Sequence, residues 1–299
     1  MTPDKLKANF QKLKNEIKRK PLLYTSDYAT TIPESFEKYT KTSSINLIVS
    51  LNEMLIEFDW PFPTYIQNDK SANKKMFILL TIIVVSEYMK EKIFFWKDTK
   101  IKEKHIKQYL DKFIYRHFSL CKKNIFSSWK NDSIFSDKHY IIDNIHNTYS
   151  KGYWYACITS TLPLLDFLCR KYFNVKNLDR DITYIVSMFR QAEISVKDTK
   201  PGYIAWEVAK EKGENIQKAT SKDLRLVGIA LSSFLNFAEI YYKFYRNDSK
   251  AMDKINRHAI IHCAANQNIW TKENATKILI FLDLTLSLKP VFTILLNER

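Results

Sequence analysis

The chain has 299 residues, and its 47 lysines and arginines outnumber 32 aspartates and glutamates to give a formal net charge of +15. Only four glycines and eight prolines are present, too few for the many tight turns of a strand-rich fold, so the composition favours an all-α protein. The positive charge is spread over both halves of the chain instead of lying in a tail, which favours a polyanion such as RNA as a partner.

The first half of the chain carries several helical patterns. An opening helix is predicted by one apolar stripe, made of Leu6, Phe10, Leu13 and Ile17. This helix should dock on the body of the protein through that stripe. Further helical patterns cover residues 44–57, 71–95 and 101–122, and breaker stretches such as DWPFPTYIQND (59–69) separate them.

No feature of the sequence directs the chain to a membrane or to secretion. The apolar run MFILLTIIVV (76–85) is too short to span a bilayer and predicts a buried helix. The N-terminal stretch MTPDKLKANF lacks the apolar region of a signal peptide. The four cysteines form no C-x-x-C pair, which is typical of reduced thiols. We therefore expect a cytoplasmic protein that does not bind membranes.

The polar segment SSWKNDSIFSDK (127–138) predicts a boundary between two helical domains, residues 1–135 and 136–299. The second domain should contain helices near 138–149, 152–173, 179–194, 203–213, 221–246, 252–264 and 271–295. Two of these helices have clear N-cap candidates, Ser221 and Thr271. The first domain is expected to have a sensing, regulatory or partner-binding role.

The stretch INRHAIIHCA (255–264) brings an arginine and two histidines close together in an apolar setting. His258 and His262 are four residues apart and would share a helix face, as metal ligands can. However, Ala259 stands where the H-E-x-x-H motif needs a glutamate, and no third ligand lies at a telling spacing, so we expect no metal. The alternative is structural, with Arg257 paired to a carboxylate at a helix start.

Arg257-x4-His262 lies between two long helical patterns in a basic all-α chain, and it resembles the Arg-x4-6-His signature of the HEPN superfamily of nucleotide-binding proteins. His258 supplies the polar residue that the family favours after the arginine. The NRH motif followed by TKENATKILIFLDLTLSL, and the earlier SKGYWYACITSTLPLLDFLCRKYF (150–173), are similar to one bacterial HEPN group. The resemblance covers residues 138–296 and implies a HEPN-like helical bundle preceded by a second helical domain.

This resemblance implies a metal-independent, cofactor-free endoribonuclease that acts as a toxin or abortive-infection effector. His262 would transfer protons, Arg257 would stabilise charge on the phosphate, and His258 would assist as a proton carrier or phosphate contact. Asn256 would orient the arginine or the RNA. An earlier carboxylate usually steadies the arginine in such sites, and Asp166 is the first choice, ahead of Glu239.

The implied site is built by two chains. An i, i+5 spacing puts Arg257 and His262 roughly 140° apart on a regular helix, and the family's solution is a homodimer with a composite cleft. In HEPN toxins silenced by nucleotidyltransferase antitoxins, a tyrosine stands where this chain has Ala264. We therefore expect another antitoxin or regulatory partner. The rival hypothesis is an inactive HEPN module for RNA binding or dimerisation, and the target, whether tRNA, mRNA or rRNA, stays open.

Overall fold

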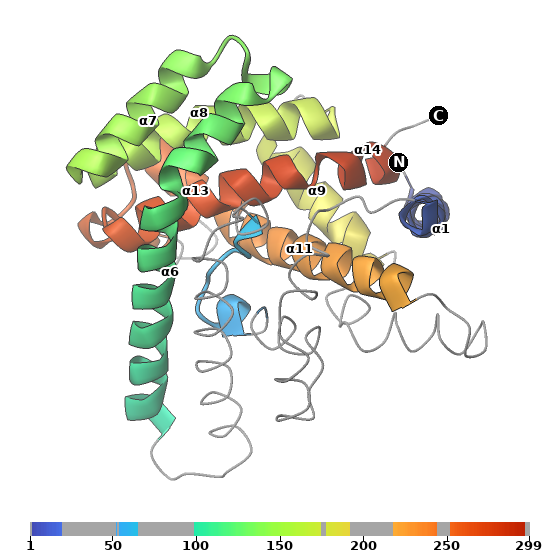
Figure 1. Cartoon of the computed structure of the whole chain (residues 1–299), viewed down its shortest axis with the longest axis horizontal. Helices are drawn as coiled ribbons and strands as arrows, with labels where there is room; N and C mark the ends of the chain where they lie inside the picture. The colour runs from blue at the N-terminus through green and yellow to red at the C-terminus, as the bar shows by residue number, and fades with distance from the viewer. Residues whose placement is uncertain are drawn as a thin grey trace.

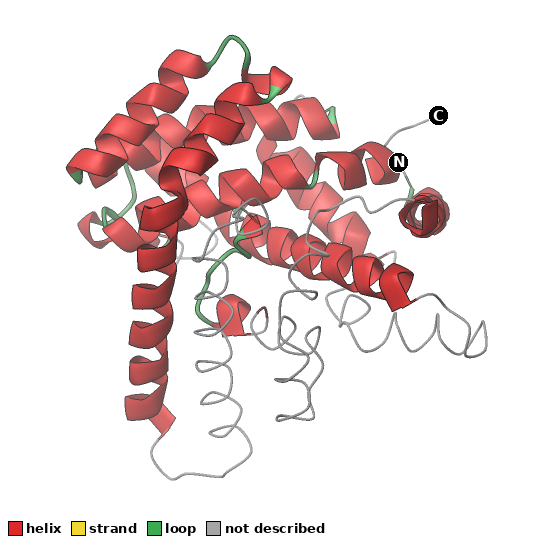
Figure 2. Ribbon diagram, in the orientation of Figure 1, coloured by secondary structure: helices red, strands yellow, loops and turns green. Residues whose placement is uncertain are grey.

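The computed structural model describes residues 2–19, 52, 54–64, 99–174, 178–191, 218–243 and 252–296. Within these ranges every regular element is a helix, in agreement with the predicted all-α class (Figure 2). The α-helices are α1 (Pro3–Arg19), α6 (Thr99–Asn131), α7 (His139–Lys151), α8 (Trp154–Phe173), α9 (Leu178–Gln191), α11 (Lys218–Tyr242), α12 (Arg257–Ile261), α13 (Lys272–Ser287) and α14 (Lys289–Leu296). Short 3-10 turns, η2 (Ser133–Phe135) and η5 (Gln267–Ile269), join some of them.

Helix α13 forms the centre of the bundle (Figure 1). Every residue from Ala275 to Thr285 is buried, so α13 is enclosed on all sides by other helices, among them α6, α8 and α11. A helix that is buried on all sides is expected to be apolar on all sides. The run ILIFLDLTL (278–286) fits this expectation except at Asp283 and Thr285. The neighbouring helices are therefore positioned by their contacts with α13.

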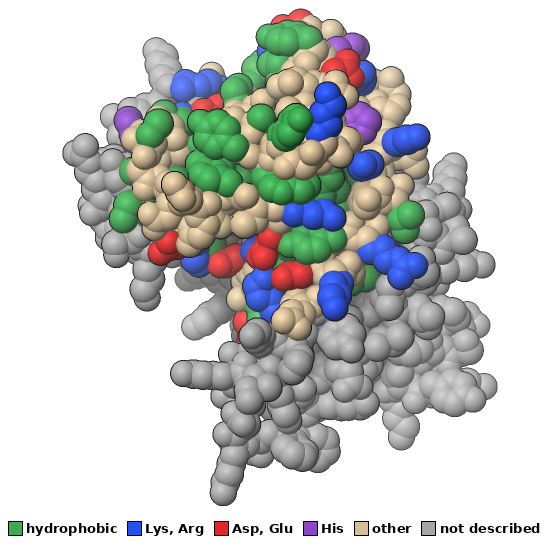
Figure 3. All heavy atoms as spheres, turned by 90° about the vertical axis from the view of Figure 1, so that its left-hand side faces the viewer, with side chains coloured by type: hydrophobic (Ala, Val, Ile, Leu, Met, Phe, Trp, Pro, Cys, Tyr) green, Lys and Arg blue, Asp and Glu red, His purple; other side chains and the backbone are tan. Residues whose placement is uncertain are grey.

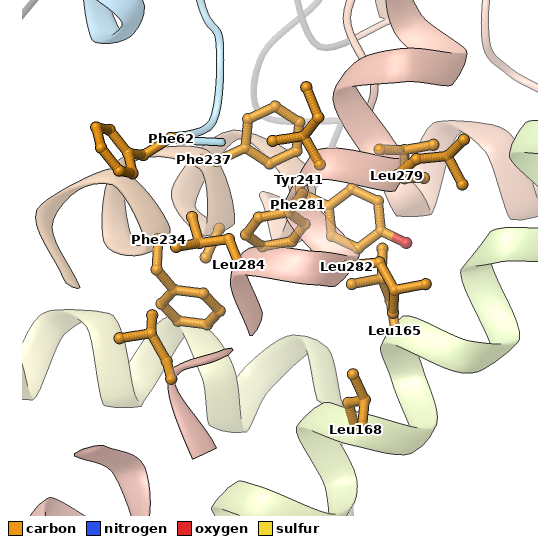
Figure 4. Close-up of a cluster of buried hydrophobic side chains, with 14 of the residues drawn as sticks. Phe62, Leu165, Leu168, Phe234, Phe237, Tyr241, Leu279, Phe281, Leu282 and Leu284 are labelled. Carbon is orange, nitrogen blue, oxygen red and sulfur yellow. The ribbon is translucent and has the colours of Figure 1, made fainter. Parts of the chain in front are cut away.

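Aromatic rings on α11 and α13 fill the middle of the core (Figure 4). Phe281 stacks on Phe234 with centroids 5.4 Å apart, and it also contacts Phe237 at 4.5 Å and Tyr241 at 5.7 Å. Leu165 of α8 points into the same cluster (Figure 4). Each buried aromatic ring removes a large apolar area from water, so these contacts hold α8 and α11 against α13.

Parts of the N-terminal half belong to the same core as the C-terminal helices. As predicted, Leu6 and Leu13 of α1 are fully buried, and α1 packs against α14, α11 and α9. Asn9 Nδ2 donates a hydrogen bond to the Leu295 carbonyl at 2.9 Å. The predicted boundary at 135/136 falls at the end of η2, and described residues on both sides of it share one hydrophobic cluster.

Residues 54–64 form a strap that crosses the C-terminal helices. Trp60 and Phe62 are almost completely buried, and the Phe62 amide donates to Ser233 Oγ at 2.7 Å. Thr64 Oγ1 donates to Asp283 Oδ2 at 2.8 Å, while Trp129 Nε1 of α6 donates to Asp283 Oδ1 at 2.8 Å. The buried carboxylate of α13 is thus satisfied by one residue of the strap and one of α6.

Several predicted elements differ from those observed. Helix α6 extends beyond the predicted residue 122 and into the expected boundary segment as far as Asn131, because Trp129 faces the core. Ser221 lies inside α11, which begins at Lys218, and is not its N-cap. The predicted helix 271–295 breaks at Leu288, since Pro290 has no N–H to donate to the Leu286 carbonyl, and α13 and α14 meet at 55°.

Other predictions are confirmed or lie outside the described residues. Thr271 is the N-cap of α13, because its Oγ1 accepts the Asn274 N–H at 3.2 Å. Residues 71–95, with the apolar run 76–85, and residues 203–213 lie outside the described part of the chain. No described helix is, by itself, long and apolar enough to cross a bilayer, although α13 and α14 meet that criterion as a bent pair.

The strap generates a prediction about stability. Replacing Trp60, which is 1% exposed and donates from Nε1 to Asp111 at 2.9 Å, with alanine should lower the free energy of unfolding by about 3–5 kcal/mol. The measurement is denaturant unfolding of the full-length protein followed by circular dichroism. Tyr140→Ala is the control, because Tyr140 is 72% exposed and its loss should change stability by less than about 0.5 kcal/mol.

Candidate functional site

Helix α12 begins at a residue that is tied to the end of α11. Asn256 is the N-cap, with extended backbone angles, and its Oδ1 accepts the Ala259 N–H at 2.9 Å. Its Nδ2 donates to the carbonyls of Ile240 at 2.9 Å and Lys243 at 2.7 Å. Asn256 is fully buried, and both its amide and its carbonyl are engaged with backbone groups. Its position suits it to orient Arg257 by fixing the start of α12.

Helix α12 ends after only five residues, whereas the sequence predicted a helix over 252–264. Cys263 adopts the left-handed conformation with φ 53°, and its N–H donates to the Ile260 carbonyl at 3.2 Å. The Ala264 N–H donates to the Ala259 carbonyl at 2.8 Å. These two bonds form a Schellman motif, which terminates a helix. His262 is the C-cap residue of this turn.

The predicted pairing of Arg257 with Asp166 is present. Arg257 Nε lies 2.8 Å from both carboxylate oxygens of Asp166, and Nη2 lies 2.8 Å from Oδ2. The two side chains are only 11% and 18% exposed. Such a forked contact fixes the plane of the guanidinium group as well as its position. Glu239, the second choice, lies on the exposed side of α11.

Uncharged groups lie beneath this ion pair. Cys169 follows Asp166 by three residues on α8, and its Sγ accepts a hydrogen bond from the Tyr242 hydroxyl at 3.2 Å. Burial raises the pKa of the Cys169 thiol to about 12 and also raises the pKa of the Tyr242 hydroxyl, so both stay protonated at neutral pH. These neutral, buried side chains provide little electrostatic screening. The attraction between Arg257 and Asp166 is therefore stronger than it would be in water.

The two histidines lie together on α12. The rings of His258 and His262 are stacked, with centroids 5.2 Å apart and planes 16° from parallel. His262 is exposed, whereas His258 is half-buried. Arg257 and His262 therefore occupy opposite ends of a helix of one and a half turns, with Arg257 held against α8. The structure brings together Arg257 with Asp166, and His258 with His262, within one chain.

A cavity of about 570 Å³ lies beside residues 253–255 and is lined by neither Arg257 nor His262. Its lining comes from the strap, α6, α11, residues 253–255 and the start of α13. Lys277 is buried there, and its Nζ lies 2.7 Å from Glu273 Oε1. The other carboxylate oxygen of Glu273, Oε2, lies 3.0 Å from Lys107 Nζ. Burial lowers the pKa of Lys277.

Sequence patterns did not predict this network of Lys107, Glu273 and Lys277, although the spacing of its residues was one available signal. Glu273 and Lys277 are spaced i, i+4 on one helix, as are Lys107 and Asp111, and such pairs are ordinary intrahelical ion pairs. The contact between Lys107 and Glu273 joins the two pairs. It forms only because tertiary packing brings α6 and α13 together. The role of Asn256 as a link between α11 and α12 was missed for the same reason.

The chain matches no family model, no curated protein and no solved structure. Across the described ranges, no three His, Cys, Asp or Glu side chains are grouped as a metal ion would require.

The end of α12 generates a prediction about stability. Cys263 carries a Cβ in the left-handed region, which costs an L-residue about 1–2 kcal/mol relative to the right-handed one. Cys263→Gly removes that cost but adds freedom to the unfolded chain, so we expect a net stabilisation of about 0.5–1 kcal/mol in denaturant unfolding.

Cys263→Ala is the matched control, because it removes the exposed thiol and keeps the Cβ. It should leave the free energy of unfolding within about 0.5 kcal/mol of the parent. A glycine variant that is less stable than the alanine variant would show that this helix end is not strained.

Proposed function

We propose that the protein is a metal-independent endoribonuclease of the HEPN type, acting in the cytoplasm as a toxin or antiphage effector. The observation that carries the proposal is the forked contact of Arg257 with Asp166 at one end of α12, together with the exposed His262 at the other end. An oriented guanidinium and an accessible imidazole are the two groups that cleavage of an RNA phosphodiester needs. The net charge of +15 favours a polyanionic substrate.

The reaction uses the substrate's own nucleophile. The 2′ oxygen forms a bond to the adjacent phosphorus while the bond to the 5′ oxygen breaks, which leaves a 2′,3′-cyclic phosphate and a 5′-hydroxyl end. One general base removes the proton of the 2′-OH, and one general acid protonates the leaving 5′ oxygen. Imidazole suits both steps near neutral pH because its ordinary pKa is about 6.5.

Arg257 stabilises the negative charge that develops on the phosphate oxygens. Asp166 binds the guanidinium group through Nε and Nη2. Because Asp166 fixes the plane of the group, little reorganisation is needed when charge develops on a bound phosphate. Asp166 and Asn256 are therefore positioning residues in this proposal. His258, whose ring stacks on that of His262, is the auxiliary proton carrier or a further phosphate contact.

Two chains are needed to complete the site. Arg257 is held against α8, and His262 lies at the far end of α12, so each chain presents an arginine and an exposed histidine at separate ends of one short helix. A two-fold axis beside α12 would bring the His262 of a second copy toward the phosphate bound at Arg257. Because a free ribonuclease damages its host, a regulatory partner or antitoxin is part of the proposal.

The first prediction from this proposal concerns cleavage. His262→Ala and Arg257→Ala should each reduce cleavage of total RNA in EDTA by at least about 100-fold, since each removes a proton-transfer or charge-stabilising group. The measurement is gel analysis with mapping of the cyclic phosphate ends. His139→Ala and Arg116→Ala are the controls, because both side chains are exposed on other helices and should leave cleavage unchanged.

A variant of either site residue that cuts as fast as the parent would contradict the catalytic assignment. RNA binding without cleavage by the parent protein would instead identify a non-catalytic HEPN module. Circular dichroism of each variant shows that a loss of cleavage does not result from unfolding.

The second prediction concerns assembly. We expect light scattering to give a homodimer, or a larger even-numbered assembly, for the full-length protein. Mixing Arg257→Ala chains with His262→Ala chains should restore part of the activity, because one mixed site then holds an intact arginine and an intact histidine. A fully active monomer would contradict the composite site.

A further inference from the structure

One exposed face of α8 leads directly to the candidate site. Tyr155, Thr159, Pro163 and Asp166 follow one another at spacings of four, four and three residues, so they lie on one face of the helix. Tyr155 is 59% exposed, Pro163 is exposed, and the other two are half-buried. Eleven residues of α-helix span about 16 Å. The face therefore runs for three turns from an exposed tyrosine to the carboxylate that holds Arg257.

The segment from Arg257 to Trp270 contacts the same face of α8 at both of its ends. At one end Arg257 binds Asp166, and at the other end the ring of Trp270 contacts that of Tyr155 edge-on, with centroids 4.6 Å apart. Both ends of this segment are therefore in contact with α8. His262 belongs to this segment. The exposed face of α8 is thus continuous with the candidate site.

Aromatic and cationic side chains surround the far end of this face. Tyr153 is 61% exposed, and Lys151, which is also exposed, ends α7 two residues before it. Lys272 follows Trp270 by two residues, and its Nζ lies 5.3 Å from the centre of the Tyr115 ring. Figure 3 shows that the face of the molecule on the left-hand side of Figure 1 carries gathered hydrophobic side chains with lysine and arginine among them. Exposed rings between cations are the pattern of a stacking platform for bases.

The middle of the face offers a hydrogen-bond acceptor. Pro163 lies inside α8 and has no N–H, so the Thr159 carbonyl lacks the intrahelical donor that every regular helix position provides. Such a carbonyl can accept from a 2′-OH or from the exocyclic amine of a base. Together these observations describe rings for bases, cations for phosphates and an acceptor between them, along a line that ends at Arg257.

We propose that this face, which we call the α8 track (Tyr153, Tyr155, Thr159, Pro163 and Asp166, with Trp270), binds single-stranded RNA and guides it to the Arg257–His262 site. Single-stranded RNA fits because its bases are free to stack on Tyr153 and Tyr155, whereas the bases of a duplex are already stacked on one another. The claim that the track guides RNA to Arg257 and His262 rests on the proposed nuclease function. Base-dependent binding at the tyrosines can be measured without cleavage.

The test uses the full-length His262→Ala protein, which keeps the track and does not cut the probe. The probes are a fluorescent 12-nucleotide oligouridylate and an oligonucleotide of equal length without bases, measured by fluorescence anisotropy. Tyr153→Ala and Tyr155→Ala should each weaken oligouridylate binding roughly tenfold, as expected when one base loses its stacking partner. Neither substitution should change binding of the abasic probe, which relies on phosphate contacts alone.

Tyr140→Ala is the matched control, because Tyr140 is a 72% exposed tyrosine on α7 that does not belong to the track. It should bind oligouridylate as the parent does. Equal affinities of the parent and both track variants would overturn the proposal, as would equal binding of the abasic and base-carrying probes by the parent. Track variants that turn a dimer into a monomer would also overturn it and identify the face as an interface between copies of this chain.

Two further outcomes separate this proposal from the nuclease function. If the protein with His262 intact never cleaves RNA but binds oligouridylate in a tyrosine-dependent way, the track is supported and the nuclease proposal fails. If it cleaves RNA while both tyrosine variants bind and cut as the parent does, the nuclease stands and the track fails.

Discussion

The burial of α13 on all sides is the constraint on which the rest of the bundle depends. A polar group that this helix carries into the core must find a partner there, because a buried unpaired donor or acceptor costs about 1–3 kcal/mol. Asp283 is satisfied by Trp129 of α6 and Thr64 of the strap. Thr276 shares a hydrogen bond of 2.8 Å with the hydroxyl of Tyr149 on α7. These contacts fix not only which elements touch α13 but also their register along it.

The candidate site depends on α13 indirectly, through the helices that pack on it. Asp166 lies on α8, and Asn256 is anchored to the end of α11; both helices pack on α13. Helix α12 has only five residues, too few to be stable alone, so its orientation is set by these two contacts and by its own caps. A change in how α8 and α11 pack on α13 would therefore change the orientation of α12 and of the residues that it carries.

Sequence patterns predicted the contacts that depend on near neighbours or on charge. The Thr271 cap follows from one side chain and an amide three residues on. The Asp166 pairing was expected because the resemblance implies a carboxylate on an earlier helix that steadies the arginine. The break at Pro290 was missed although its cause stands in the sequence, because the apolar run on both sides masks it. The strap around Trp60 and the left-handed Cys263 could not be predicted, since each is imposed by packing between distant segments.

The positions of the four cysteines allow thiol labelling to report separation of the helices in the bundle. Cys121, Cys157 and Cys169 are buried, and burial raises the pKa of the latter two thiols to about 12, so they do not react with alkylating reagents while the bundle is closed. Cys263 is exposed one residue after His262. The rate at which Cys263 is labelled therefore follows motion at the end of α12, whereas labelling of the other three follows separation of the helices around α13.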